Sequence, residues 1–302
     1  MTLVRITQNM LSHQSYSGMQ SAMSRVAKAQ EQLTTGRLIN RPSDDPTGAT
    51  TAMRIRSSLA SQEQFVRNAD DAVGWLDQTD GTLSTMGDQI TRARDIALQG
   101  ANTGAMGQQA REALATEIDQ IRAGLIGSAN TQYLDRPIFG GITAGTKAYD
   151  PATGLLADPA SIGAGAGVVR TVAEGARVRI DVEGPDVFGT SPNSVFDRLA
   201  ALSTALKTND TAGISAAVNT LKGDADRIAN VQSDIGARTV RVENARSVAT
   251  AASLTLKNAL SEVENVDLAK ATVELGLQEV AYQAALGATA KVLQPSLLDF
   301  LR

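Results

Sequence analysis

The chain has 302 residues, enough for about two ordinary domains, and its composition excludes several kinds of protein. A formal net charge of −4 argues against nucleic acid as a partner, and the absence of cysteine excludes disulfides and thiolate metal sites. No apolar run approaches the roughly 18 residues that cross a membrane, so we expect no membrane insertion. Only 3% of the residues are aromatic while 42% are hydrophobic, which suits narrow helix seams better than a thick core.

The first predicted helix carries a row of small and apolar residues at alternating steps of three and four. This spacing is typical of the seam along which a long helix packs lengthwise against other helices. We expect this row to form a subunit interface. Its members are Met19, Ala22, Val26, Ala29 and Leu33.

A stiff, acidic elbow is predicted after this helix. Gly36 can take the left-handed conformation that ends a helix, and the two prolines that follow lack the N–H that a continuing helix needs. Asp45, or one of the two residues before it, can cap the next helix with Pro46 at its first position. The elbow residues are Gly36, Pro42, Ser43, Asp44, Asp45 and Pro46.

The distribution of proline and glycine predicts two helical arms around a broken middle. Residues 47–136 and 193–294 contain no proline, whereas residues 137–192 hold five of the eight prolines and 10 of the 26 glycines. In the first arm we expect a long helix over residues 46–99. A third helix around residues 114–125 would fold back antiparallel against it.

The middle segment changes to a period of two, which indicates β-strands. Residues 177–183 alternate strictly, so that Val178, Ile180 and Val182 share one face. Residues 168–173 are the expected partner strand, and residues 133–141 are a candidate for a further one. We therefore expect a small β-rich insert.

The second arm returns to the helical rhythm. A short helix is predicted over residues 195–206, a second long helix over residues 214–263, and a last helix that Pro295 interrupts near the end of the chain. Four large apolar residues crowd the final six positions. The subunit-interface residues expected in this part are Val273, Leu277, Val280, Ala284, Leu297, Leu298, Phe300 and Leu301.

The two ends of the chain carry opposite charge. Residues 1–40 have a net charge of +3 and residues 261–302 a net charge of −3, so a basic head and an acidic tail can lie side by side. Exposed ion pairs add little stability each. We therefore expect the apolar seam to hold the two ends together.

These patterns predict a mainly α fold: a long antiparallel helical rod, coiled-coil-like, built from both chain arms, with a small β-rich insert in the middle. Residues 1–44 and 263–302 would pair as terminal helices in an assembly domain. Residues 45–136 and 193–262 would form the rod domain, and residues 137–192 a surface-exposed insert.

Candidate catalytic and metal-binding residues are few. His13 is the only histidine, so His-based zinc sites are excluded and a solvated surface position is expected for it. Residues 140–147 resemble a phosphate-binding loop only faintly, because no metal-binding hydroxyl follows the lysine. Three aspartates at 70, 77 and 80 share one helix side, which indicates a solvated face. We expect no catalytic, cofactor-binding or metal site.

Short motifs at both ends and in the middle of the chain point to a family. They are RITQNML (5–11), QLTTGR (32–37), RPSDDP (41–46), GPDVFG (184–189), VFD (195–197), EVAYQA (279–284) and SLLDFL (296–301). Together they resemble the flagellin superfamily and, more narrowly, its hook-associated protein 3 family. The resemblance covers both ends well and the middle loosely.

The resemblance implies a structural component of the bacterial flagellum, a junction adaptor between the hook side and the flagellin filament, and therefore no enzyme. It implies export without a cleaved signal peptide to the extracellular flagellum, and assembly through terminal helices that become ordered against neighbouring subunits. The implied partners are further copies of the chain in a ring or helix, hook-associated protein 1, flagellin and a cytoplasmic export chaperone.

Two other functions remain open: a filament flagellin, or a signalling coiled-coil protein such as the cytoplasmic hairpin of a chemoreceptor. RPSDDP and the compact middle disfavour the first, and the second would not need a β-rich insert or the LLDFL terminus. The residues alone also leave open whether the terminal arms pair within one chain or become ordered only on assembly.

Overall fold

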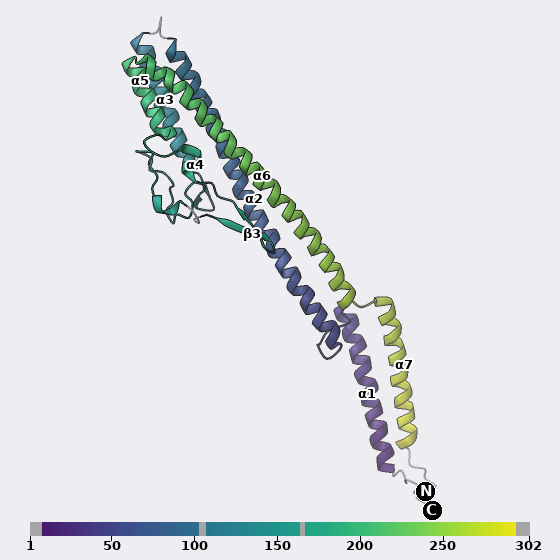
Figure 1. The fold of residues 1–302 in the computed structure, drawn as a ribbon. Helices are drawn as coiled ribbons and strands as arrows, with labels where there is room; N and C mark the ends of the chain where they lie inside the picture. The colour runs from purple at the N-terminus through teal and green to yellow at the C-terminus, as the bar shows by residue number, and fades with distance from the viewer. Residues whose placement is uncertain (1–7, 103–106, 164–166, 294–302) are drawn as a thin grey trace, which may run out of the picture. The chain divides into compact units, whose positions relative to one another are not determined.

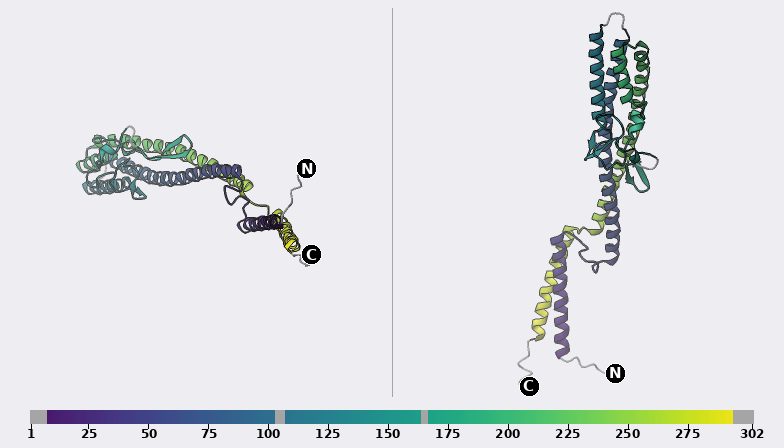
Figure 2. Two further views of the ribbon diagram at one scale, coloured as in Figure 1. Left: turned by 90° about the horizontal axis from the view of Figure 1, so that it is seen from below. Right: turned by 90° about the vertical axis from the view of Figure 1, so that its left-hand side faces the viewer.

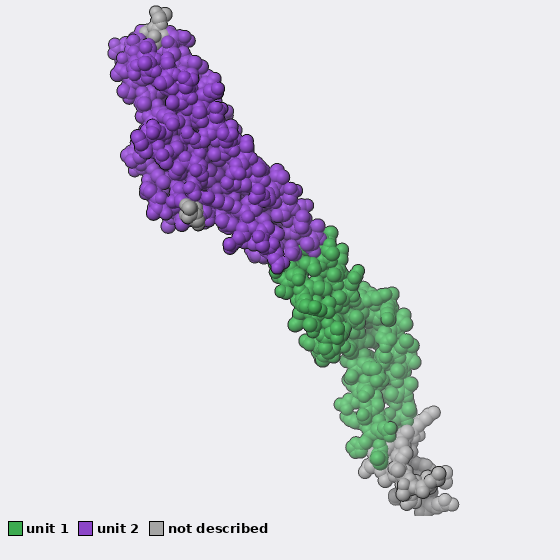
Figure 3. All heavy atoms as spheres, in the orientation of Figure 1, with its two compact units in different colours: residues 1–61, 253–302 green, residues 62–252 purple. Residues whose placement is uncertain are grey.

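The structure is a computed structural model, and it describes residues 8–102, 107–163 and 167–293 (Figure 1). The chain divides into two compact units (Figure 3). Unit 1 comprises residues 1–61 and 253–302, and unit 2 comprises residues 62–252. Two long helices, α2 (Pro46–Ala101) and α6 (Thr211–Glu264), contribute to both units.

Unit 1 holds the terminal helices α1 (Gln8–Thr35) and α7 (Leu268–Leu293), together with the adjoining parts of α2 and α6. The terminal helices lie side by side (Figures 1 and 2). They run antiparallel, because Arg25 contacts Gln278 in the middle of the pair while Gly36 contacts Val266 at one end. The period of three and four in both helices explains this arrangement, because it places the packing residues on one face of each helix.

In unit 2, α2 and α6 run antiparallel, with Asp70 beside Arg246 and Asp80 beside Gln232. Each helix buries a row of residues spaced by seven, the repeat expected of coiled-coil-like packing. Every member is at most 1% exposed. The rows are Leu76, Leu83, Ile90 and Ala97 on α2, and Leu221, Ile228, Ile235 and Val242 on α6.

Two shorter helices, α3 (Gln108–Ala129) and α5 (Val195–Thr208), pack against each other in the same unit. The expected third helix does fold back onto α2, where Arg92 of α2 pairs with Glu117 of α3 at 2.6 Å. Ser194 caps the start of α5, because its hydroxyl accepts the N–H of Asp197 in a capping box.

The insert contains two small antiparallel strand pairs. β1 (Gln132–Tyr133) pairs with β2 (Arg136–Pro137), and β3 (Val169–Ala173) pairs with β4 (Ala176–Arg179). A 3-10 helix, η2 (Pro159–Ser161), and a short helix, α4 (Gly184–Phe188), complete it. In the β3–β4 turn Gly175 has a φ of 71°, a left-handed conformation that glycine adopts without steric cost.

The strand expected over residues 177–183 is shorter in the structure, because β4 ends at Arg179. Ile180 still donates its N–H to Val168 at 2.9 Å, but the N–H of Val168 is taken by the carboxylate of Asp181. A side chain thus replaces the backbone partner and ends the ladder. The strand considered over residues 133–141 is likewise reduced to two-residue segments.

Aromatic residues join the insert to the helices. Phe188 of α4 lies 5.2 Å from Phe139, 5.3 Å from Tyr149 and 5.2 Å from Phe196, measured between ring centroids. Since Phe196 belongs to α5, the buried residues of the insert and of the helices form one continuous core. The few aromatic residues of the chain are concentrated where a wider space must be filled.

The expected fold class is confirmed: the protein is mainly α, its long helices pack against each other, and the strands are confined to a small middle region. Across the described residues, no helix combines the length and the apolar character that a membrane crossing requires.

We predict that Phe188→Ala lowers the free energy of unfolding by about 3–5 kcal/mol, because it leaves a cavity among three other aromatic rings. Urea unfolding followed by circular dichroism and by the fluorescence of Trp75, the single tryptophan, measures this change. The matched control is Leu134→Ala, whose side chain is 73% exposed. Equal effects of the two substitutions would contradict a core that includes the insert.

Candidate assembly interface

The terminal pair is held by one row of residues on each helix. On α1 the row alternates steps of four and three, and its alanines are the most buried members, Ala22 at 3% and Ala29 at 5% exposure. Small residues at these positions let the two backbones approach closely. The α1 row is Ser15, Met19, Ala22, Val26, Ala29 and Leu33, and the α7 row that packs on it is Ala271, Leu275, Gln278, Tyr282, Ala285 and Thr289.

Polar contacts add little to this pair. Arg25 donates from Nε to the side-chain oxygen of Gln278 at 3.1 Å, on the exposed edge of the contact. Among the described residues no ion pair joins α1 to α7, although the two ends carry opposite net charge. The seam therefore holds the helices together by packing.

α7 carries a second apolar row, and it points away from α1. Val273, Leu277 and Val280 are 65%, 60% and 65% exposed. Ala284 and Gly287 continue the row and are exposed as well. We call these five residues the outer row. A row of large apolar side chains that a helix exposes to solvent indicates a surface that another protein segment can cover.

The structure thus places the expected interface residues on different faces. The five residues predicted on α1 face α7 of the same chain, whereas the four predicted on α7 belong to the outer row, which no described residue covers. The remaining four, Leu297, Leu298, Phe300 and Leu301, lie outside the described residues.

At the elbow, backbone hydrogen bonds join the connection between α1 and α2 to the connection between α6 and α7. Leu38 donates its N–H to the carbonyl of Glu264 at 2.7 Å, and Val266 donates to the carbonyl of Gly36 at 3.0 Å. Gly36 has a φ of 69°, and this left-handed conformation ends α1. The same conformation turns the carbonyl of Gly36 toward the connection between α6 and α7.

An ion pair between a half-exposed arginine and a buried carboxylate fixes the same point. Glu264, the last residue of α6, is 5% exposed, and its carboxylate accepts from Arg56 of α2 at 2.7 and 2.8 Å. A buried carboxylate without a partner costs free energy, so this pair selects the arrangement in which α2, α6 and the elbow meet.

Asp44 organises the elbow loop. Its carboxylate pairs with Lys28 of α1 at 3.0 Å and accepts the backbone N–H groups of Asn40 and Arg41 at 3.2 and 2.9 Å. The hydrogen bond from Lys28, followed by that from Arg41, holds the pKa of Asp44 below its ordinary value of 3.8. Next to it, Asp45 accepts the N–H groups of Thr47 and Gly48, both at 3.0 Å, and so caps α2.

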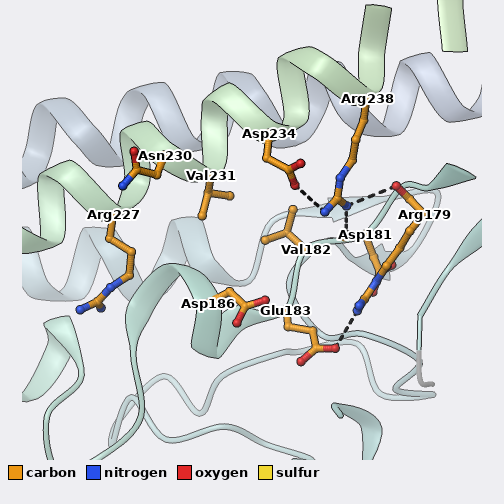
Figure 4. A pocket seen from close by; sticks show the side chains of 10 residues that line it. All are labelled: Arg179, Asp181, Val182, Glu183, Asp186, Arg227, Asn230, Val231, Asp234 and Arg238. Atoms are coloured by element: carbon orange, nitrogen blue, oxygen red, sulfur yellow. Dashed lines mark hydrogen bonds and ion pairs between the residues drawn. The ribbon is translucent and has the colours of Figure 1, made fainter. Parts of the chain in front are cut away.

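A second cluster of charges lies in unit 2, where α6 faces the insert (Figure 4). Arg238 of α6 donates to the carbonyls of Arg179 and Asp181 at 3.2 and 3.0 Å and pairs with Asp234 at 2.5 Å. Arg179 in turn pairs with Asp181 and Glu183 at 2.9 and 2.7 Å. These groups satisfy one another beside a cavity of about 230 Å³, so the cluster holds the insert on α6.

The residues considered for catalysis or metal binding lie apart from the elbow contacts and from the charge cluster between α6 and the insert. His13 is exposed on α1, and Asp70 pairs with Arg246 at 2.6 Å. Within the described ranges there is no group of three or more histidine, aspartate or glutamate side chains placed to hold a metal ion.

We predict that Arg56→Gln loosens the elbow, because it leaves the buried carboxylate of Glu264 without its charged partner. The amides of Leu38 and Val266 should then exchange with deuterium at least about fivefold faster, which NMR can measure. Arg41→Gln is the control, since it breaks the exposed pair with Glu31 and should change these rates by less than about twofold. Similar rates in both variants would exclude a special role for Glu264.

We also predict that acid loosens the elbow loop through Asp44. A group whose pKa is lower in the folded state stabilises that state fully above its unfolded pKa, and the stabilisation is lost as the pH falls through the folded pKa. Amide protection at Asn40 and Arg41 should therefore fall below about pH 4. Asp44→Asn should show weak protection at neutral pH and no such decrease. A pH-independent wild type would refute this assignment.

Comparison with known proteins assigns the family. The chain matches two family descriptions, "Bacterial flagellin N-terminal helical region" over residues 6–144 and "Bacterial flagellin C-terminal helical region" over residues 216–301. Together these stretches take up well over half of the chain and include the elbow and the outer row.

Individual relatives agree with this. Flagellar hook-associated protein 3 of Salmonella typhimurium is 24% identical over 93% of this chain and 95% of its own length. A flagellin of Bacillus subtilis is 25% identical over 99% of this chain and 100% of its own length. A solved flagellar hook-associated protein from Vibrio parahaemolyticus is 20% identical and has the same fold, with a TM-score of 0.66 over 74% of this chain and 100% of the solved one. The chain belongs to the flagellin superfamily, within it to the hook-associated protein 3 family, and is a structural protein of the bacterial flagellum.

Proposed function

We propose that this protein is the junction adaptor that connects the hook side of the flagellum to the flagellin filament, and that it assembles through its terminal helices. The observation that carries the assembly mechanism is the outer row of α7, an apolar surface left exposed by the part of the chain that the structure describes. Its partners are further copies of the chain in a ring or helix, hook-associated protein 1 on the hook side and flagellin on the filament side.

The physical driving force is the burial of the outer row. Complete burial of a valine or leucine side chain contributes about 1.5–3 kcal/mol. Covering the valines and leucine of the row, which are 60–65% exposed, contributes a large part of that for each residue along one side of α7. A contact of this kind is weak in a single pair and strong when every subunit in a ring makes it. The terminal cluster Leu297, Leu298, Phe300 and Leu301 extends the same interface.

The α1 row serves assembly by holding α7 in place. Met19, Ala22, Val26, Ala29 and Leu33 fix which face of α7 is turned inward, and therefore which face is presented to a neighbour. In this proposal the assembly domain comprises residues 1–44 and 263–302. The rod domain comprises residues 45–136 and 193–262, and residues 137–192 form a surface-exposed insert.

The proposal places the mature protein outside the cell, in the flagellum, after export without a cleaved signal peptide. A cytoplasmic export chaperone would cover the apolar terminal segments before export, because such segments favour aggregation when exposed. The lack of cysteine agrees with a chain that passes unfolded through an export channel, since no disulfide must form or break.

The relative from Bacillus subtilis keeps a second function in view, that of the filament flagellin itself. Electron microscopy of a deletion strain separates the two. Loss of a junction adaptor leaves completed hooks without filaments and releases flagellin into the medium. Loss of the filament flagellin leaves hooks without filaments and no flagellin in the medium.

We predict that Val280→Asp leaves the thermal stability of the isolated chain nearly unchanged but abolishes incorporation into flagella. Val280 is 65% exposed and in the outer row, so an aspartate there stays solvated until a neighbour must cover it. Sheared flagella analysed by immunoblot measure incorporation.

Two controls accompany this variant. Gln283→Asp adds the same charge at an exposed position beside the outer row and should be incorporated. Leu275→Asp places the charge in the row that packs on α1 and should reduce the helix content of the isolated chain. Normal incorporation of Val280→Asp would remove the outer row from the assembly interface.

A further inference from the structure

α1 carries a second exposed row beside the one that packs on α7. Each member comes one residue after a member of the α1 row, so the second row is turned by about 100° from it and faces one side of the helix pair. Its two largest side chains, Tyr16 and Met23, are 62% and 61% exposed. No member carries a charge. We call it the flank row: Tyr16, Gln20, Met23, Ala27, Gln30 and Thr34.

The outer row of α7 faces a different direction. Each of its members comes two residues after a member of the α7 row that packs on α1, so it is turned by about 200° and points away from α1. The terminal pair therefore exposes two different rows on two sides. A contact between the outer rows of two copies would end at a dimer and leave both flank rows exposed. A contact between an outer row and a flank row repeats from subunit to subunit and generates a ring or a helix.

The side chains of the two rows are complementary in size at the same height along the pair. Arg25 lies beside Gln278, and counting the same number of residues from each in opposite directions places Tyr16 at the level of Gly287. Gly287 has open space where a side chain would stand. Subunits related by rotation about an axis along the pair keep these levels, so the ring of Tyr16 can lie over Gly287 of the next subunit.

Further along the rows, a small residue again faces a large one. The same count brings Ala27 to within one residue of the level of Leu277. The charges at the edge of this contact also agree. Lys270 borders the outer row, and Glu31, which pairs with Arg41 at 3.3 Å within its own chain, borders the flank row on the side that would face Lys270 of the neighbour. Opposite charges at such an edge favour one register over others.

We propose that the outer row of α7 in one subunit packs on the flank row of α1 in the next, so that each α7 lies between the α1 of its own chain and the α1 of its neighbour. This pairing rests on the proposed function, because it names the surface that covers the outer row. It leaves neither of the two exposed rows uncovered in the assembled ring or helix.

Gly287→Tyr tests the fit at one level. Because Gly287 has open space within its own chain, the substitution should leave the circular dichroism of the isolated chain unchanged. It should lower incorporation into flagella at least about tenfold, since the added ring meets Tyr16 of the neighbour, and adding Tyr16→Ala should restore most of it. Gly18→Tyr is the control, because Gly18 also has open space but lies on the other flank of α1. Normal incorporation of Gly287→Tyr, or no rescue by Tyr16→Ala, would overturn the pairing.

A double-cysteine variant identifies the partner surface directly, because the natural chain has no cysteine that could interfere. Ala27→Cys with Leu277→Cys places the two thiols at one level on rows that face different sides of the pair, so the disulfide should form between subunits. The control, Ser21→Cys with Leu277→Cys, moves the first thiol to the other, also exposed, flank of α1. Oxidised, sheared flagella of the first variant should give a ladder of linked chains at least about tenfold stronger than the control, because a disulfide needs Cα atoms within about 7 Å.

The remaining outcomes separate this pairing from the proposed function. Ladders of equal strength in the two double variants would overturn the pairing, and so would linked dimers formed by Leu277→Cys alone, which would show the outer row packing on itself. Loss of incorporation by Val280→Asp without a ladder in the first double variant would contradict the pairing alone. Normal incorporation of Val280→Asp would instead contradict the proposed assembly surface.

Discussion

Only one of the two apolar faces of α7 can be covered by α1, and this constraint explains most of what the terminal region can do. The inward row packs against Ala22 and Ala29, whose small side chains bring the helices close together. The outer row is left with its valines and leucine in water. Within a single chain, such a helix is stabilised only by the contact of its inward face. A neighbouring subunit that covers the outer face adds further stability.

The contacts at the elbow fix the direction in which the outer row is exposed. Backbone hydrogen bonds join the connections at Gly36 and Glu264, and the ion pair with Arg56 adds a charged contact that tolerates few alternatives. Without it, the terminal pair would be attached through two independent linkers. With it, unit 1 presents α7 in a fixed relation to the adjoining ends of α2 and α6, as a repeated contact between identical subunits requires.

Much of this could be predicted from the sequence because long helices repeat their pattern many times. The steps of seven from Leu76 to Ala97 and from Leu221 to Val242 indicate helices that pack lengthwise, and proline and glycine mark several of the helix ends. The inward row of α7 escaped prediction because it includes Gln278, Tyr282 and Thr289, while the more apolar outer row stood out. Apolar periodicity identifies a face that will be covered, but not whether the cover belongs to the same chain.

The partnership of Arg56 with Glu264 spans 208 positions and has no local signal. The shortened β4 has a similar cause, since only the folded structure brings Asp181 to the N–H of Val168.

A cryo-electron microscopy map of the hook–filament junction containing this protein tests the central claim most directly. The account predicts that in the assembled junction α1 and α7 of each subunit remain paired along Ala22, Ala29 and Ala271, and that Val273, Leu277 and Val280 are buried against a neighbouring subunit. A map in which the outer row of α7 faces solvent, with the contacts between subunits made elsewhere, would contradict the account.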